Sequence, residues 1–163
     1  MATPHIRPAA PADAPRCHAI ELAAYEGDEA ATLEKIALRI AGYPQGFPVL
    51  ELDGRVVGFI NSGCAHEVAM ADEAFKELVG HDPLAPNVVI MSVAVDPAHQ
   101  GRGWASLLMR RFVEDMRREG KAAIHLMCRE HHVGFYERLG YRYVRPSAST
   151  HGNLAWHEMV MEL

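Results

Sequence analysis

One stretch of the sequence combines a strand, a glycine-containing loop and a helix in immediate succession. A run rich in β-branched residues from Val88 to Val95 indicates the strand, and it stops at Asp96-Pro97, a turn signal. Gln100 to Gly103 forms the loop, and from Ser106 apolar residues recur at helical spacing until Gly120 ends the pattern. This order predicts an α/β architecture in which the positive end of a helix lies beside the end of a strand.

The loop predicts a site for a pyrophosphate, because unpaired N–H groups gather at a helix start and glycine lets an anion approach them. It is not a P-loop, since no Lys follows the glycines, and not a dinucleotide fingerprint, since position 106 is Ser. The loop instead has the pattern Q-x-x-G-x-A, which is carried by Gln100, Gly103 and Ala105. The alternative is an ordinary tight turn that caps a surface helix.

Length and composition are typical of one soluble domain over residues 1–163. Hydrophobic residues make up 49% and charged residues 23% of the chain, and the net charge of −5 argues against nucleic-acid binding. The three cysteines have no close pairing, which favours reduced thiols and a cytoplasmic location. We expect no membrane span and no signal peptide, and the sequence makes no prediction about oligomeric state.

The remaining pattern predicts strands and helices on both sides of the central stretch. Asp13 is expected to cap the first helix, and Asp53-Gly54 is a strong hairpin signal between two strands. The predicted strands are 6–8, 47–52, 55–61, 88–95, 122–128, 141–145 and 155–163; the predicted helices are 14–25, 33–40, 106–119 and 132–139. The fold class is therefore α/β (α+β), a mixed sheet of about seven strands flanked by about four helices.

The connection between Ser62 and Asn87 is long and polar. It holds one candidate helix, from Asp72 to Val79. Long loops in compact domains tend to be functional, so this segment is a candidate substrate lid, with a solvated connector as the alternative.

Two later motifs are more specific. Leu126-Met-Cys-x-Glu130 is followed by Phe135-Tyr-Glu-Arg-Leu-Gly-Tyr141, and then by P-x-A-x-x-x-G-x-L-x-W-x-E-M from Pro146 to Met159. Together with the glycine loop, they resemble the GNAT acetyltransferase superfamily, and more narrowly the arylalkylamine (serotonin) N-acetyltransferases. The segments Tyr25 to Ala31 and Gly54 to Ile60 fit the same group less tightly, and the resemblance spans residues 5–163.

The resemblance implies a GNAT fold that binds acetyl-CoA (coenzyme A). Backbone N–H groups of the central strand at Ser92, Val93 and Val95 would engage the thioester and pantetheine, and the glycine loop would hold the pyrophosphate. The cofactor-binding residues implied in this way are Ser92, Val93, Ala94, Val95, Gln100, Gly101, Arg102, Gly103, Trp104, Ala105, Ser106 and Tyr136.

Tyr136 matches the general acid that protonates the leaving thiolate. The ordinary pKa values of a thiol and a phenol are close enough for this transfer. The alternative is a tyrosine that only packs on its neighbours, with its hydroxyl in water.

The chain differs from the vertebrate arylalkylamine N-acetyltransferases in the residues expected to deprotonate the amine. Those enzymes carry an H-x-H pair on the central strand, and the matching positions here are Val89 and Met91. Two replacements for the pair are possible. One is Glu29, which matches an acidic residue in the D-E segment of the insect-type enzymes, and the other is a chain of waters. The further candidates, each also readable as a solvated or core histidine, are His66, His131 and His132.

The expected function is direct transfer of an acetyl group to the primary amine of a small molecule, possibly an arylalkylamine, in a ternary complex. We predict no metal, because no metal-ligand spacing is present, and Cys128 is expected to be an inert buried thiol. The alternatives are an acetyltransferase for protein N-termini, lysines or polyamines, and a non-catalytic acyl-CoA sensor.

Overall fold

The computed structural model describes residues 3–25, 30–70, 80–149, 151 and 154–163. Within these residues, seven strands form one sheet in the order β1-β2-β3-β4-β5-β7-β6. Every neighbouring pair is antiparallel except β4 and β5, which are parallel. The strands are β1 (Pro4–Pro8), β2 (Pro48–Leu52), β3 (Arg55–Ala65), β4 (Asn87–Val95), β5 (Ala123–Cys128), β6 (Arg142–Pro146) and β7 (His157–Glu162).

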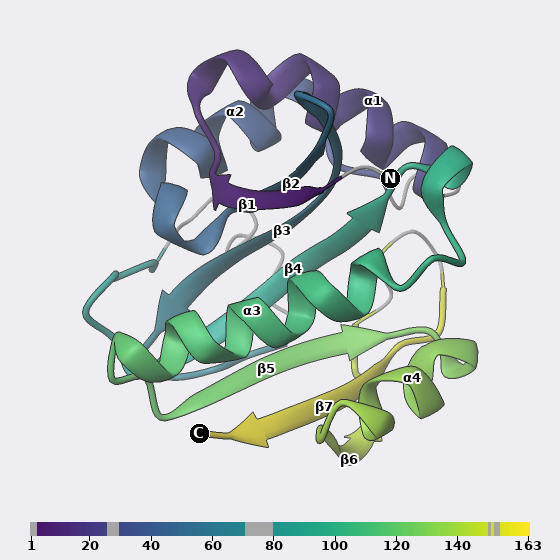
Figure 1. The fold of residues 1–163 in the computed structure, drawn as a ribbon. Coiled ribbons are helices and arrows are strands. Elements are labelled where there is room, and N and C mark those ends of the chain that lie inside the picture. The colour runs from purple at the N-terminus through teal and green to yellow at the C-terminus, as the bar shows by residue number, and fades with distance from the viewer. Residues whose placement is uncertain (1–2, 26–29, 71–79, 150, 152–153) are drawn as a thin grey trace.

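The helices are α1 (Ala14–Ala24), α2 (Leu33–Gly42), α3 (Trp104–Arg118) and α4 (Val133–Arg138). Figure 1 shows α3 lying across the sheet, with α1 and α2 together beside β1 to β3. The mixed sheet with its helices confirms the predicted fold class. No helix in the described part of the chain is both long and apolar enough to cross a membrane.

Alternation along the strands divides the core between the two faces of the sheet. Val49 and Phe59 pack with α1 and α2, whereas Leu50 and Ile60 pack with α3. Helix α3 buries Leu108, Met109, Phe112 and Met116, which together form the apolar stripe that its sequence predicts. Burial of each such side chain contributes roughly 1.5–3 kcal/mol.

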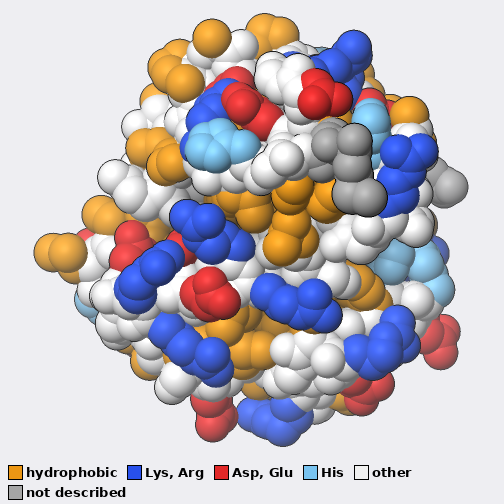
Figure 2. Space-filling model, viewed as in Figure 1, with side chains coloured by type: hydrophobic (Ala, Val, Ile, Leu, Met, Phe, Trp, Pro, Cys, Tyr) orange, Lys and Arg blue, Asp and Glu red, His pale blue; other side chains and the backbone are white. Residues whose placement is uncertain are grey.

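The outer surface of α3 is a solvated face. Figure 2 shows Lys and Arg side chains over this region with acidic side chains among them. On α3 itself, Asp115 pairs with both Arg111 and Arg118. Exposed pairs of this kind contribute little to stability.

The central strand β4 separates from β5 halfway along its length. The parallel pairing runs only from Asn87 opposite Ala123 to Val89 opposite His125, while β4 stays paired with β3 as far as Val95. A register shift opposite Asn61/Ser62 leaves Met91 as an extra residue in β4, which is a β-bulge. Among the described residues, no strand therefore pairs with that edge of the second half of β4.

Most predicted boundaries agree with the structure, and the hairpin at Asp53-Gly54 is confirmed with φ of 52° and 77°. Three details differ. Strand β3 continues to Ala65, and α3 begins at Trp104. The Asp13 side chain does not cap α1, because it accepts hydrogen bonds from Arg7 and from the Ala10 amide instead. The helix predicted over 72–79 falls outside the described residues, as does the lid proposed with it.

Candidate active site

A cavity of about 570 Å³ opens where β4 leaves β5. It is bounded by α1, β4, the end of β5 and α4, and this volume is ordinary for a small-molecule site. The predicted residues that line it are Ser92, Val93, Ala94, Val95, Gln100, Ala105 and Tyr136. The other predicted cofactor residues (Gly101, Arg102, Gly103, Trp104 and Ser106) lie in the loop and in the first turn of α3 that follows it.

The glycine loop is open on the side where an anion would lie. Gly101 and Gly103 have φ of 78° and 84°, a left-handed conformation in which glycine is favoured, and no atom lies within 4 Å of a Cβ built on either. In the described chain, the amides of residues 101–106 donate to no backbone acceptor, and the first such bond of α3 runs from Leu107 to Gly103. A row of free N–H groups at a helix start is suited to binding a pyrophosphate.

The free edge of β4 is met by a tyrosine from α1. The Tyr25 hydroxyl donates to the Val93 carbonyl at 2.7 Å and accepts from the Val93 amide at 3.1 Å. It thus satisfies both peptide groups that β5 would have paired had it continued alongside. At the end of the strand, the Gln100 side-chain amide donates to the Val95 carbonyl at 3.0 Å.

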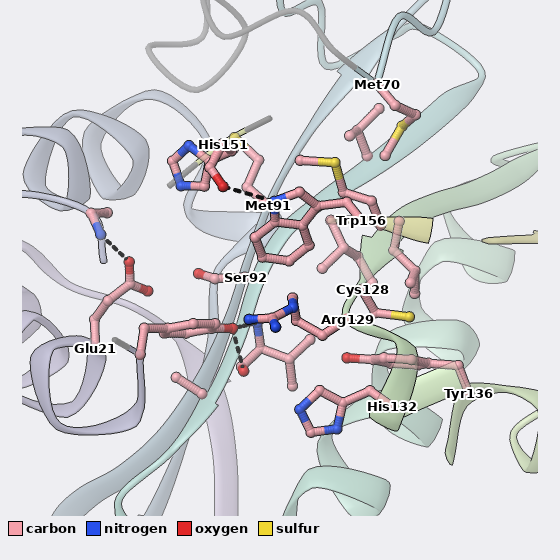
Figure 3. Close-up of a pocket in the computed structure, with 18 of the residues that line it drawn as sticks. Glu21, Met70, Met91, Ser92, Cys128, Arg129, His132, Tyr136, His151 and Trp156 are labelled. Carbon is pink, nitrogen blue, oxygen red and sulfur yellow. Dashed lines mark hydrogen bonds between the residues drawn. The ribbon is translucent and has the colours of Figure 1, made fainter. Parts of the chain in front are cut away.

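Tyr136 lies on α4, and its hydroxyl points into the pocket (Figure 3). Burial, and then the neighbouring Cys128, raise the pKa of Tyr136 well above its ordinary value, so the phenol keeps its proton. Burial also raises the pKa of the Cys128 thiol to about 11. Cys128 is therefore a protonated, buried thiol at neutral pH, as expected, and all three cysteines are free.

Val89 and Met91 both line the pocket, so its central-strand wall is apolar where the resembling vertebrate enzymes carry histidines. His131 and His132 line it from the turn before α4, with ring centroids 4.1 Å apart. The pKa of His132 lies below its ordinary value, first because the ring is partly desolvated and then because His131 and Arg129 lie beside it. His66 pairs with Asp82 at 2.8 Å.

Three residues of the pocket carry chemistry that the sequence patterns did not single out. Glu21 and Tyr25 lie one helical turn apart at the C-terminal end of α1, and Arg129 follows β5. Figure 3 shows Glu21 and Arg129 in the pocket. For Glu21 a signal existed, because it falls in the buried helical stripe with Ala14 and Cys17. Charged side chains are seldom fully buried unless they are paired, so a glutamate in an apolar helical stripe is a candidate for a specific role. Tyr25 begins a segment that fits the arylalkylamine N-acetyltransferases, but no pattern gave it a role, and none marked Arg129, because the roles of both depend on tertiary contacts.

Glu29, the predicted base, lies outside the described residues. Among the residues that are described, no three His, Cys, Asp or Glu side chains converge in a way that would hold a metal ion.

Comparisons with known proteins identify the fold. A sequence model of the Acetyltransferase (GNAT) family matches residues 12–141. The chain is 40% identical over 55 residues to the chloroplastic Serotonin N-acetyltransferase 2 of Oryza sativa subsp. japonica. That match covers 34% of this chain and 28% of the length of the rice protein, so it spans less than a third of the rice protein.

Solved structures match nearly the whole chain. The loading GNATL domain of CurA from Lyngbya majuscula superposes with a TM-score of 0.88 at 15% identity, covering 98% of both chains. GphF, a GNAT-like decarboxylase in complex with isobutyryl-CoA, gives 0.84 at 20% identity, covering 97% of this chain and 98% of its own. The putative acetyltransferase yncA from Salmonella typhimurium, with its cofactor acetyl-CoA, gives 0.71 at 22% identity, covering 99% and 94%. At these identities the likeness establishes the fold.

Proposed function

Because this chain belongs to the GNAT acetyltransferase family, we propose that it transfers an acetyl group from acetyl-CoA to the primary amine of a small molecule, in which an arylalkyl body is one candidate. The observation that carries the proposal is one continuous site. The unpaired edge of β4 and the Tyr136 hydroxyl border the same cavity, and so do Gln100 and Ala105, which flank the glycines whose amides are free. Along acetyl-CoA, the pyrophosphate would lie at the glycine loop, the pantetheine along the edge of β4, and the thioester near Tyr136.

The cofactor would be held by main-chain groups. The amides of residues 101–106 would bind the pyrophosphate, and the free edge of β4 around Val93 would lie along the pantetheine. The Tyr25 hydroxyl now bonded to Val93 would either stay as a bridge or yield its place to the pantetheine amide. Such donors are already oriented in the folded chain, so they need little reorganisation during the reaction.

The amine nitrogen would attack the thioester carbon, and the new C–N bond would form as the C–S bond breaks. Tyr136 would give its proton to the departing thiolate, and a base would take a proton from the nitrogen. Glu29 or a water chain remains the predicted base from the sequence. No acyl-enzyme is needed, because burial keeps the Cys128 thiol protonated.

The test is release of coenzyme A from acetyl-CoA with a panel of amines: phenethylamine, tryptamine, spermidine and a peptide with a free N-terminus. Mass spectrometry of the products should find the N-acetyl derivative of at least one small amine. Acetylation of the peptide alone would move the assignment to a protein acetyltransferase. Stabilisation by acetyl-CoA without turnover on any amine would show a sensor instead.

A second candidate function is decarboxylation of an acyl-CoA that carries a carboxylate. Arg129 lines the pocket near Tyr136, and no residue in the described part of the chain accepts a hydrogen bond from its side chain or pairs with it (Figure 3). A free guanidinium there would bind an acyl carboxylate. Loss of CO₂ would leave a carbanion beside the thioester, and a proton from Tyr136 would complete the product. Release of CO₂ from malonyl-CoA without an amine tests this reaction.

A further inference from the structure

Glu21 is a buried carboxylate with one oxygen unaccounted for. Its side chain lines the pocket from α1, and the residue is only 2% exposed. One oxygen accepts a hydrogen bond from the Ala31 amide. The other, Oε1, is buried and has no hydrogen-bond partner.

The bond to Ala31 does not account for a charged side chain at this position. A glutamine would satisfy the same amide with its carbonyl oxygen and carry no charge into the interior. Burial of a carboxylate oxygen without a partner destabilises the fold unless a cation or a donor compensates it. Lys35 and Arg39 also line this end of the pocket, yet neither forms an ion pair with Glu21 in the described chain.

Glu21 lies on the side of the pocket where α1 meets the free edge of β4, opposite Tyr136. Tyr25, one helical turn further along α1, touches β4 at Val93, where the strand has left β5. One turn corresponds to a rise of about 5.4 Å, so the free oxygen lies within reach of a group that approaches β4 from the α1 side. Figure 3 shows Glu21 across the pocket from Tyr136 and His132. The other described carboxylate that lines the pocket, Glu67, is exposed.

An apolar wall of the pocket, near both Glu21 and Tyr136, suits the apolar body of an organic amine. Met70, Met91 and Trp156 lie together along one wall (Figure 3). The Trp156 indole N–H already donates to the His151 carbonyl at 2.8 Å. The polar edge of the ring is therefore satisfied. Trp156 is only 8% exposed, and the part of its ring that lines the pocket is suited to pack on an apolar body.

We infer that Glu21 binds the amino group of the acceptor, so that the site takes cationic amines with an apolar body in preference to their neutral analogues. This inference rests on the proposed function, because it assigns the acceptor half of the same pocket. Oε1 accepts a hydrogen bond from the ammonium group, and its charge compensates the ligand's charge. Oε1 first takes one proton from the ammonium group, which frees the nitrogen lone pair to attack the thioester carbon. As the C–N bond forms and the C–S bond breaks, the sulfur takes the proton of Tyr136, and the second nitrogen proton returns to the Tyr136 oxygen through solvent. The proton on Oε1 is released to solvent when the product leaves.

The experiment compares binding of phenethylamine and of 2-phenylethanol by titration calorimetry, with coenzyme A present to fill the cofactor side. The wild-type protein should bind the amine at least 10-fold more tightly than the alcohol. Glu21→Gln keeps an acceptor for the Ala31 amide, and it should weaken amine binding by 10-fold or more while leaving the alcohol unchanged. Glu114→Gln removes the same charge from the exposed face of α3 and should change neither affinity.

Equal affinity of the wild-type protein for the amine and the alcohol would overturn the inference without any variant. Unchanged amine affinity in a folded Glu21→Gln protein would overturn it as well. The proposed function fails in a different way: the amine would bind through Glu21, yet acetyl-CoA would not be consumed.

Discussion

Replacing Tyr136 by Phe tests whether its hydroxyl supplies the proton that the leaving sulfur needs. The hydroxyl makes no hydrogen bond in the described structure, and the ring packs against Phe135 and Tyr141 at centroid distances of 5.0 and 5.9 Å. Phenylalanine keeps both ring contacts and removes no protein hydrogen bond. We therefore expect the free energy of unfolding to change by less than about 1 kcal/mol.

The activity should fall far more than the stability. A thiolate that must leave without a placed acid loses the contribution of one general acid, so kcat should drop roughly 10- to 1,000-fold. That loss corresponds to about 1.4–4 kcal/mol of transition-state stabilisation. Because burial raises the pKa of Tyr136, the phenol stays protonated throughout the neutral range, and the wild-type pH profile should show no loss of this acid there.

The assay is steady-state release of coenzyme A with the best amine, together with thermal unfolding with and without acetyl-CoA. Tyr141→Phe is the matched control, because Tyr141 is also a buried tyrosine with an unbonded hydroxyl but does not line this pocket. Its kcat should remain near the wild-type value. A Tyr136→Phe protein with kcat within about twofold of wild type would refute the acid assignment.

Four further changes test other parts of the site. Gly103→Glu should abolish the rise in melting temperature with acetyl-CoA, because its carboxylate would repel the pyrophosphate; Gly120→Glu, with a similar φ at the other end of α3, should keep the rise. Cys128→Ser should keep kcat within about threefold in steady-state assays, since the thiol has a pKa of about 11, and a loss of 100-fold would favour an acyl-enzyme. Tyr25→Phe should lower the free energy of unfolding by about 1–3 kcal/mol in urea, because two hydrogen bonds to Val93 are lost; an unchanged midpoint would contradict this. The profile of kcat/KM should rise from pH 6 to pH 9 without an imidazole limb near pH 6.5, because Val89 and Met91 stand in the histidine positions and the pKa of His132 lies below its ordinary value; a limb at that pH which disappears in His132→Asn would show that an imidazole is the base.

The fold was predictable wherever local signals agreed with the final packing. Asp53-Gly54 specified a turn with positive φ on its own, and the apolar spacing in α3 specified the face that packs on the sheet. Asp13 shows the opposite case. Its position favoured a helix cap, but Arg7 lies near enough in the folded chain to take the carboxylate. A charge-assisted pair with a guanidinium is stronger than a neutral hydrogen bond to a helix amide.

The residues that we assign to the cofactor could be proposed from the sequence, whereas most of those that we assign to the acceptor could not, for a physical reason. The cofactor side is built from one continuous strand, loop and helix, so its residues are neighbours in sequence. The acceptor side depends on contacts between distant segments, such as Tyr25 with Val93, 68 positions apart. Neither that contact nor the unpaired oxygen of Glu21 has a local pattern, because both arise only when α1 packs on β4.

In the proposed reaction, the arrangement of the pocket would keep the two proton transfers apart. Acyl transfer to an amine releases one proton from the nitrogen and supplies one to the sulfur. An acid and a base in direct contact would exchange the proton with each other. Here the Tyr136 hydroxyl projects from the α4 side and Glu21 from the α1 side, with the apolar side chain of Met91 on the strand between those elements (Figure 3). In the resembling vertebrate enzymes the base stands on the central strand itself. With Val89 and Met91 at the matching positions, the proposed reaction would need a protein base from another element, unless a chain of waters serves. Helix α1 already brings a buried carboxylate to the cavity, and an apolar wall strengthens its attraction for a cationic amine.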